Sequence, residues 1–461
     1  MSVKVARVSY EFTLHEMWGG SVDELGTNGR QKKRCLEMLK KSMPLWLAAF
    51  ILCICMTARA EEGSSRRLIS EKLIAQIDYS SWVQGTFKAS PDSKRVAYVA
   101  RTGTKVSVVV DGKAGKQYDG IGKDTFIFSP DGKHVAYGAS IGINQFIVLD
   151  GKEEKQYDGI AAGSLAFSPD CKRFAYAAKA SNKWFVVMDG KEQKQYEAMG
   201  KGSVVFSPDS MRLAYMAQIG NKWTAVVDGK EEKQSKGIVK GNLTFSPGSK
   251  RFAYRAGRDN NEFVVVDGKA GKQYDGIGVG TLVFSPDSMR LAYAAKVANK
   301  WFVVIDGREE KQYDGIGTGT SIFSPDSKRM AYVAAIGKKM FVVVDGKEEK
   351  QYDGIGEGTP IFSPDSKRVA YAAAVRNKML MVLDGKEGKQ FDVTGWPVFS
   401  PDSNHLAYVA KASDKWVMVV DGKTRNEYSG FGGWIVFDSP DNFHYLAQKG
   451  NNIYLVEERI K

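Results

Sequence analysis

A three-residue string, Ser-Pro-Asp, recurs along the chain at an almost constant interval. Its serine, followed once by Gly in place of Asp, stands at Ser90, Ser129, Ser168, Ser207, Ser246, Ser285, Ser324, Ser363, Ser400 and Ser439. Every interval is 39 residues except the 37 between Ser363 and Ser400. Asp-Gly recurs in the same phase, from Asp111 to Asp421. A period of about 20 to 50 residues indicates a repeat architecture, in which each unit buries its apolar surface against its neighbours.

Within one unit, residues 280–311, the pattern predicts a four-stranded antiparallel meander. Two apolar runs, 280–284 and 290–295, flank a Ser-Pro-Asp-Ser turn, where Pro suits the second position of a type I turn. A third run, 301–305, is β-branched and aromatic and leads into Asp306-Gly307, a strong hairpin signal. The fourth strand, 309–313, is polar. No helical periodicity appears after residue 82.

Four strands in about 40 residues make one β-propeller blade. The first three strands are apolar nearly throughout, as expected where neighbouring blades cover both faces, and the polar fourth suits the outer rim. We predict an all-β fold, a β-propeller of about ten four-stranded antiparallel blades over residues 73–461, with a linker at 61–72. A β-solenoid is disfavoured, because its coils are shorter and would not need two hairpin signals per unit.

The two ends of the repeat array predict how the ring closes. The last unit stops after its third strand, at residues 452–457, whereas residues 73–82 carry the register of a fourth strand, with Tyr79 at the position of Tyr313. An N-terminal strand would then complete the last blade. One ten-bladed ring is favoured. The alternative is two five-bladed rings, because the least regular stretch, residues 235–261, lies near the middle.

The first 60 residues predict export. Lys40-Lys41 precede an apolar run at 43–56, and an Ala-x-Ala site ends at Ala60. This is the layout of a cleaved secretory signal, and the run is short for a membrane span, so an uncleaved anchor is disfavoured. We expect a secreted or periplasmic protein with no transmembrane span in the mature chain. Met38 would start a signal of ordinary length, which indicates a misplaced start codon at Met1.

Cysteine usage agrees with this assignment. Cys35, Cys53 and Cys55 lie in the removed part, so Cys171 remains alone and the mature chain has no internal disulfide. A lipid anchor on Cys53 or Cys55 is disfavoured, because neither follows the small residue that bacterial lipoprotein signals usually carry. The stability of the mature chain must therefore come from its core.

The charge does not favour one class of partner. Beyond residue 60 the chain has 57 Lys and Arg against 48 Asp and Glu, and the two signs are interleaved along it. A net positive charge can attract polyanions, so an anionic glycan is kept as an alternative partner. Export makes nucleic acid an unsuitable target.

The string Phe128-Ser-Pro-Asp-Gly-Lys-His-Val-Ala-Tyr137 resembles the WD-like repeat of TolB-type β-propellers, which also occurs in the propeller domains of prolyl-oligopeptidase-type peptidases. The match extends from about residue 85 to 445. It implies an extracytoplasmic propeller that binds other proteins. TolB-like proteins also carry a separate N-terminal α/β domain and usually fewer blades, and this chain departs from both. The resemblance therefore bears on the fold more than on a particular partner.

Signatures of catalysis and metal binding are missing from the sequence. It holds no H-E-x-x-H, C-x-x-C or EF-hand loop, and no α/β segment that could carry a G-x-S-x-G nucleophile elbow. His134, His405 and His444 fall in or near second strands of separate blades and are interpreted as surface substitutions. The D-G-I-G-x-G runs lack the following helix that a phosphate site needs. We expect no enzyme activity, cofactor or metal site.

Repeated carboxylates are the one feature that invites a catalytic interpretation. Asp306, Glu309, Glu310 and Asp314, with their equivalents in other units, could line a metal or sugar site. However, the Asp of Asp-Gly is required by its turn, and the glutamates alternate with Lys on an outer strand. Turn and solubility roles are the favoured interpretation.

One column varies between repeats while its neighbours stay apolar. Five residues before each Asp-Gly the column reads Val106, Gln145, Trp184, Trp223, Glu262, Trp301, Met340, Met379 and Trp416. Such tolerance indicates a half-exposed position, at the start of the third strand and on the face that carries the connections between blades. The candidate binding residues are Trp184, Trp223, Trp301, Met340, Met379 and Trp416, with Lys183, Lys222 and Lys300 beside them. The alternative is that these side chains pack between blades.

These observations together favour a noncatalytic secreted or periplasmic scaffold that binds protein. Two other functions stay open: a carbohydrate-active or peptidase-related enzyme whose site lacks a known signature, and adhesion to anionic glycans. The variable column indicates a face of the propeller but identifies no ligand.

Overall fold

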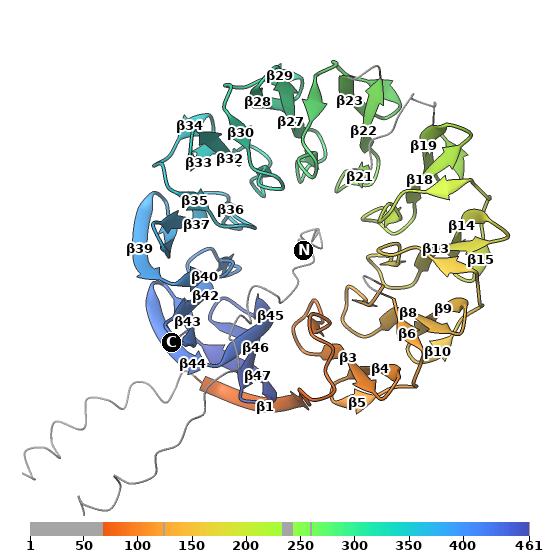
Figure 1. Ribbon diagram of the computed structural model, residues 1–461. Coiled ribbons are helices and arrows are strands. Elements are labelled where there is room, and N and C mark those ends of the chain that lie inside the picture. Colours follow the sequence, from red (N-terminus) through yellow and green to blue (C-terminus); the bar gives the residue numbers. More distant parts are fainter. Residues whose placement is uncertain (1–67, 123–124, 233–242, 259–260, 461) are drawn as a thin grey trace, which may run out of the picture.

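The computed structural model describes residues 68–122, 125–232, 243–258 and 261–460, which form one ring of ten sheets around a central opening (Figure 1). The ten-bladed all-β propeller is therefore confirmed, and the alternative of two smaller rings is wrong. No helix in this part of the chain has the length and apolarity to cross a membrane. The expected signal peptide, its cleavage site at Ala60 and the alternative start at Met38 lie outside the described residues.

Blades are numbered in chain order. The first five consist of β2 (Lys88–Ala89), β3 (Val96–Thr102), β4 (Lys105–Val110) and β5 (Lys113–Ala114); β6 (Gly120–Ile121), β7 (Ile127–Phe128), β8 (Val135–Ile141), β9 (Asn144–Leu149) and β10 (Lys152–Glu153); β11 (Gly159–Ile160), β12 (Ala166–Phe167), β13 (Phe174–Ala180), β14 (Lys183–Met188) and β15 (Lys191–Glu192); β16 (Ala198–Met199), β17 (Val205–Phe206), β18 (Leu213–Ile219), β19 (Lys222–Val227) and β20 (Lys230–Glu231); and β21 (Leu243–Phe245), β22 (Phe252–Arg258), β23 (Asn261–Val266) and β24 (Lys269–Ala270).

The second five consist of β25 (Gly276–Ile277), β26 (Val283–Phe284), β27 (Leu291–Val297), β28 (Lys300–Ile305) and β29 (Arg308–Glu309); β30 (Gly315–Ile316), β31 (Ile322–Phe323), β32 (Met330–Ile336), β33 (Lys339–Val344) and β34 (Lys347–Glu348); β35 (Gly354–Ile355), β36 (Ile361–Phe362), β37 (Val369–Val375), β38 (Lys378–Leu383) and β39 (Lys386–Phe391); β40 (Val393–Thr394), β41 (Val398–Phe399), β42 (Leu406–Ala412), β43 (Lys415–Val420) and β44 (Lys423–Tyr428); and β45 (Gly430–Phe437), β46 (Asn442–Lys449), β47 (Asn452–Arg459) and β1 (Leu68–Gln76).

The turns form as the sequence predicts. Asp306 and Gly307 have φ angles of 51° and 83°, the two positive values that a type I′ hairpin turn requires. The inner strand of most blades is interrupted, as in blade 6, where β25 and β26 both pair with β27. In blade 6 the outer strand is shorter than expected. Only β29 and a single bridge between Tyr313 and Trp301 pair with β28.

The hydrophobic core lies between blades, not within them. Tyr313, at the end of the outer strand of blade 6, packs in one cluster with Ala292 of its own blade and Tyr332 and Phe341 of blade 7. Its ring meets those of Phe341 and Tyr332 edge-on, with centroids 5.6 and 6.4 Å apart. Aromatic pairs of this kind contribute about 0.5–1.5 kcal/mol beyond the area they bury. Each blade therefore depends on its neighbour for a closed core.

The face of the disc that carries the Ser-Pro-Asp and Asp-Gly turns, here called the turn face, is joined by polar contacts. In blade 6 Ser285 Oγ donates to Asp287 Oδ1 (2.5 Å), and the Asp287 amide donates to Ser327 Oγ of the next blade (2.9 Å). Arg290 pairs with Asp306 (2.9 Å) and also donates to the Ser327 carbonyl (3.2 Å). The constant residues of the repeat thus tie each blade to the next.

The outer edge is joined by ion pairs. Lys272 and Lys311 pair with Glu309 and Glu348 of the following blade, at 2.6 and 2.7 Å. The glutamates expected to serve solubility therefore also join blades, although exposed pairs of this kind contribute little each.

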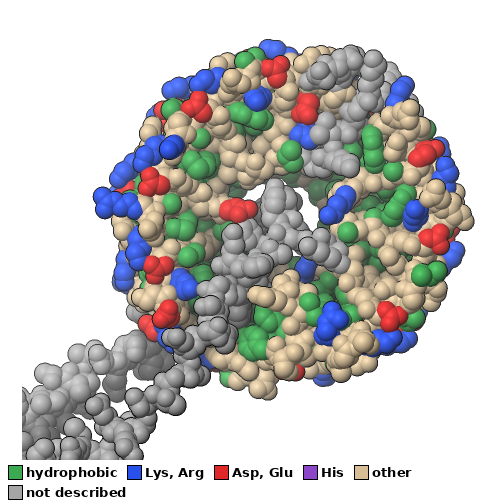
Figure 2. Space-filling view, viewed as in Figure 1, with side chains coloured by type: hydrophobic (Ala, Val, Ile, Leu, Met, Phe, Trp, Pro, Cys, Tyr) green, Lys and Arg blue, Asp and Glu red, His purple; other side chains and the backbone are tan. Residues whose placement is uncertain are grey.

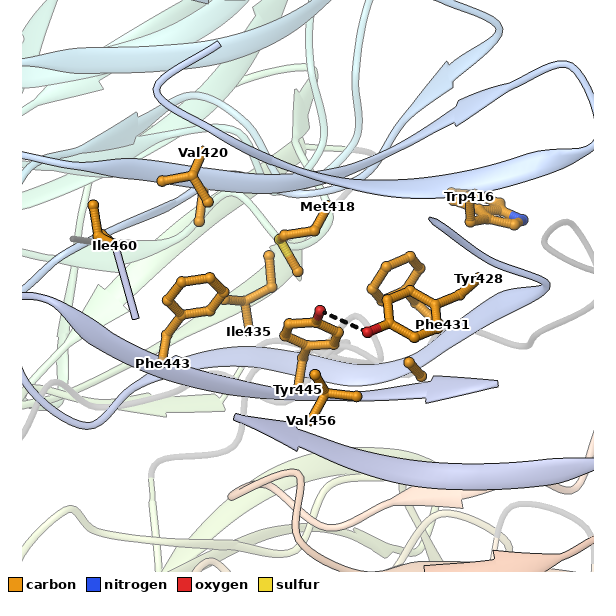
Figure 3. Packing of buried hydrophobic residues seen from close by; sticks show 12 residues of the cluster. Trp416, Met418, Val420, Tyr428, Phe431, Ile435, Phe443, Tyr445, Val456 and Ile460 are labelled. Carbon is orange, nitrogen blue, oxygen red and sulfur yellow. Dashed lines mark hydrogen bonds between the residues drawn. The ribbon is translucent and has the colours of Figure 1, made fainter. Parts of the chain in front are cut away.

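The ring closes as expected, with three strands from the C-terminus and one from the N-terminus in blade 10. β1 pairs antiparallel with β47, from Leu68 opposite Glu458 to Gln76 opposite Asn452. Figure 3 shows the core between blades 9 and 10, where side chains of β43 face those of β46: Trp416, Met418, Val420, Phe443 and Tyr445. On the other side of blade 10, Ala75, Ile77 and Leu446 pack with residues of blade 1.

The bounds of the closing strand differ from the expected residues 73–82. β1 begins at Leu68, so five residues of the expected linker belong to the propeller. It ends at Gln76 because the Asp78 carboxylate accepts hydrogen bonds from the amide of Ser80 and the hydroxyl of Ser81, which turns the chain. Tyr79 is 39% exposed, so it does not occupy the buried position of Tyr313.

The irregular middle of the sequence does not interrupt the ring. The Asp209 amide of blade 4 donates to Ser249 Oγ of blade 5 (2.9 Å), and the Gly248 amide of blade 5 donates to Ser288 Oγ of blade 6 (2.7 Å). The same turn-face contact therefore continues through blade 5.

The three histidines replace members of these joints. His134 and His405 stand at the arginine position and contact Asp150 (2.6 Å) and Asp421 (2.7 Å). His444 is not a surface substitution as expected, since it is 2% exposed. It lies at the closing junction, where its Nδ1 contacts Asp438 (2.7 Å) and its Nε2 contacts the Asp92 carbonyl of blade 1 (2.8 Å).

Removal of the closing strand tests the closure. We expect deletion of residues 61–76 to lower the melting temperature by about 10 °C or more, because it removes both the pairing with β47 and the core contact of Ala75. Deletion of residues 61–67 alone, which leaves β1 intact, is the control and should melt like the full mature chain. Equal melting temperatures for the two deletions would contradict the closure; circular dichroism against temperature measures both.

The turn-face carboxylates predict a stability that falls in acid. Hydrogen bonds from the serines of their own strings lower the pKa of Asp131, Asp170, Asp209, Asp287, Asp326, Asp365 and Asp402. Because these pKa values lie below the unfolded value of about 3.9, their contribution is fully present well above pH 4 and is lost as the pH falls through the folded values.

We therefore expect the melting temperature to drop between pH 5 and pH 3, and to drop less in a D287N/D326N double variant. Asn cannot lose this charge because it carries none, so the variant should be less stable at pH 7 yet less sensitive to acid. An equal drop in both proteins would show that these carboxylates carry no pH-dependent stability.

Candidate binding face

The face opposite the turn face, here called the hairpin face, is formed by the hairpins between second and third strands and by the connections between blades. Several aliphatic side chains on this face are exposed to solvent. They are Ile141 (42% exposed), Ile143 (91%), Val279 (54%), Val297 (44%), Ile336 (42%) and Val393 (39%). On the turn face the comparable residues are Met211 and Met289, each 75% exposed.

Lysines at the start of the third strands are held in ion pairs between blades. Lys300 Nζ lies 2.6 Å from Oδ1 of Asp314, in the connection from blade 6 to blade 7, and Oδ2 of Asp314 accepts the amide of Gly337 in blade 7 (2.7 Å). These two contacts lower the pKa of Asp314, the Gly337 hydrogen bond most. Lys105, Lys339 and Lys378 make the same pairs with Asp119, Asp353 and Asp392.

The three lysines of the predicted site differ in whether they form such an ion pair. Lys300 is fully engaged with Asp314, and Lys183 lies 3.5 Å from Glu197. Lys222 is exposed and forms no ion pair with a described residue. Lys300 and Lys183 therefore join blades, whereas Lys222 does not pair with a described residue.

The predicted aromatic and methionine column is mostly packed between blades. Trp416 is 5% exposed, in the core of blades 9 and 10. Trp223, Met340 and Met379 are half-buried against neighbouring core clusters. Whether these residues also contact a partner stays a prediction.

Trp184 and Trp301 occupy the same position of the column in blades 3 and 6. Both are half-buried, and a lysine of the second strand lies over each ring: Lys179 Nζ is 6.0 Å from the Trp184 ring and Lys296 Nζ is 5.8 Å from the Trp301 ring. Such cation–π contacts contribute about 0.5–1 kcal/mol at exposed sites. Each ring therefore presents a cation and an apolar edge together on the hairpin face.

The two polar members of the column contact the next blade through the backbone. Gln145 Oε1 accepts the amide of Ile160 in blade 3 (2.9 Å), and Glu262 Oε2 accepts the amide of Ile277 in blade 6 (2.6 Å). The column is therefore a junction position, where an apolar or a polar side chain can bridge to the neighbour.

The hairpin tips were missed by the sequence reasoning. Ile143 stands at the hairpin tip of blade 2, where other blades have Asn182, Asn221 and Asn299. One apolar residue at an otherwise polar repeat position was the only sign of this surface in the sequence.

The charges of the disc are mixed. Figure 2 shows one side, with Lys and Arg along its outer edge and Asp and Glu among them. In the described part of the chain no three His, Cys, Asp or Glu side chains gather where they could hold a metal ion.

Comparison with known proteins finds similarity among solved structures only. No family model matches the sequence, and no curated protein matches it. Among solved structures, a crystal structure of the eukaryotic initiation factor aligns with a TM-score of 0.44 and 16% identity over 73% of this chain and 96% of that one. TolB from Acinetobacter baumannii aligns with a TM-score of 0.28 and 10% identity over 62% and 80% of the two chains. The β-propeller domain of the Trilobed protease from Pyrococcus furiosus aligns with a TM-score of 0.29 and 14% identity over 55% and 92%.

Proposed function

We propose that this chain is a noncatalytic, secreted or periplasmic scaffold that binds a partner protein through its hairpin face. The TolB-like repeat string and the signal-like first 60 residues support the location. The chemistry of the hairpin face supports the class of partner.

The proposal rests mainly on the difference between the constant and the variable positions of the repeat. Residues that are constant between repeats form contacts between blades; examples are Ser285, Asp287 and Arg290. Exposed aliphatic residues that vary between repeats lie on the hairpin face of blades 2, 6, 7 and 9. Exposed apolar side chains beside aromatic ones are typical of protein interfaces.

Trp184 and Trp301, with Lys183 and Lys300 beside them, are proposed to lie within this interface. Half-exposed tryptophans are the side chains most often found to dominate binding energy. The alternative partner, an anionic glycan, is less well supported, because the charge of Lys300 is already neutralised by Asp314.

Matched substitutions on the two faces test the proposal. The triple variant I143N/V297T/I336T gives each hairpin position a residue that another blade carries there, and M211K/M289K does the same on the turn face. We expect the hairpin variant to recover at least about tenfold less partner from the native envelope by affinity capture, as expected from loss of one or two central contacts.

The turn-face variant should recover the partner as well as the unchanged protein does, and both variants should melt within about 2 °C of it, since exposed substitutions change stability little. Undiminished capture by the hairpin variant, or loss of capture by the turn-face variant, would contradict the proposal.

The proposed location predicts a defined mature N-terminus. We expect the exported protein to begin at Glu61, because the Ala-x-Ala site ends at Ala60. Mass spectrometry of N-terminal peptides from the secreted or periplasmic fraction measures this. Recovery of the protein only with peptides from residues 43–60 still attached would show that the segment is not removed.

A further inference from the structure

One junction of the ring lacks the side chains that fill the others. At the start of the third strand, blades 3 and 6 carry Lys183-Trp184 and Lys300-Trp301, whereas blade 2 carries Asn144-Gln145. Both the cation and the large apolar group are therefore missing between blades 2 and 3.

Because blade 2 has no lysine at this position, Asp158 lacks the ion pair that Asp314 forms. Asp158 stands fourteen residues after Asn144, as Asp314 stands after Lys300, and it keeps the backbone half of the joint by accepting the Ser181 amide (2.9 Å). The side-chain Nδ2 of Asn144 instead donates to Gln156 Oε1 (3.1 Å). Asp158 is exposed and forms no ion pair with any residue of the described chain.

The missing tryptophan leaves a hollow of about 280 Å³, far more than the roughly 30 Å³ that one water occupies. Its lining includes Gly120, Ile121, Ser140 and Gln145 of blade 2 and Ile160 and Ala162 of blade 3. In blade 3 the equivalent space is covered, because the Trp184 ring approaches within 3.9 Å of the site of a Cβ on Gly159, which corresponds to Gly120.

In blade 5 other side chains of the protein occupy the corresponding space. It also lacks the Lys-Trp pair and carries Asn261-Glu262. There Arg255 is 5% exposed and donates to the Ile277 carbonyl of blade 6 (2.7 Å), while Glu262 accepts the Ile277 amide. The residue of blade 2 that corresponds to Arg255 is Gly138, which lines the hollow. The junction of blades 2 and 3 is thus left open.

The surface beside the hollow is apolar. Ile143 is 91% exposed at the tip of the same hairpin, and Ile141 is 42% exposed at its base. An open carboxylate, a hollow and two exposed isoleucines therefore coincide on one hairpin, in the only described blade whose tip residue is aliphatic.

We propose that the junction of blades 2 and 3 binds a segment of the partner protein that carries Lys or Arg next to a large apolar residue, the cation on Asp158 and the apolar side chain in the hollow. The partner then supplies in trans the pair of groups that Lys183-Trp184 and Lys300-Trp301 supply in cis. This inference rests on the proposed protein-binding function and assigns it a site.

A displayed library of random heptapeptides, selected on the mature protein, tests the site. We expect enrichment of a basic residue adjacent to Trp, Phe, Leu or Ile. The best peptide should bind at least about tenfold more weakly to N144K/Q145W, in which the ring's own pair fills the junction, and to I143N, as measured by calorimetry. The filled variant should also melt at a higher temperature, because it gains an ion pair and buries apolar surface.

The D158N variant tests the cation separately. It should weaken a Lys-containing peptide but leave the same peptide with norleucine in place of Lys unchanged. The I336T variant, on the hairpin face but outside this junction, is the matched control and should bind every peptide normally.

Equal binding of the selected peptides to the unchanged protein, N144K/Q145W and I143N would overturn the inference, as would an absence of enriched peptides or of any preference for a basic residue. The proposed function would still stand in those cases if capture of the natural partner is lost in I143N/V297T/I336T. If capture is unaffected by that variant while the peptides behave as expected, the site binds basic-apolar segments but the partner in the envelope docks elsewhere.

Discussion

The packing of each blade's sheet on the next is the interaction on which the whole ring depends. No blade closes a core alone: Tyr313 of blade 6 is buried only because Tyr332 and Phe341 of blade 7 surround it. Polar joints add to this packing at three places, the turn face, the outer edge and the hairpin face, and each spans the boundary between two blades. Stability in such an array is approximately a sum of unit terms and neighbour terms, so the boundary is where the sequence is most constrained.

The strand order, the turns and the closure could be predicted because they rest on local signals. Asp306-Gly307 adopts the positive φ angles that its residue types favour, and the missing fourth strand of the last unit pointed to the N-terminus. The charged residues were harder to interpret. Glu309 pairs with Lys272, which lies 37 residues earlier, and a partner in the preceding blade becomes visible only when the ring brings equivalent strands side by side.

The variable column lies at the start of the third strands, as predicted, but its exposure differs from blade to blade. Members of the column range from buried, as Trp416, to exposed, as Gln145. The Trp416 side chain packs between blades, and the Gln145 side chain accepts a hydrogen bond from the next blade. Sequence variation alone cannot separate these cases, because a junction that accepts alternative fillers varies as much as a binding surface does. The burial of each side chain makes the distinction.

The pairing of β1 with β47 joins the beginning of the folded chain to its end. β1 leaves the ribosome before any blade, whereas its partner strand is the last to be made, so the ring stays an open arc throughout synthesis. During that interval the apolar flank of blade 1, including Val96 and Tyr98, has no blade 10 to cover it. A chain built in this way gains its final shape in one late step, when the last strand to be made meets the first.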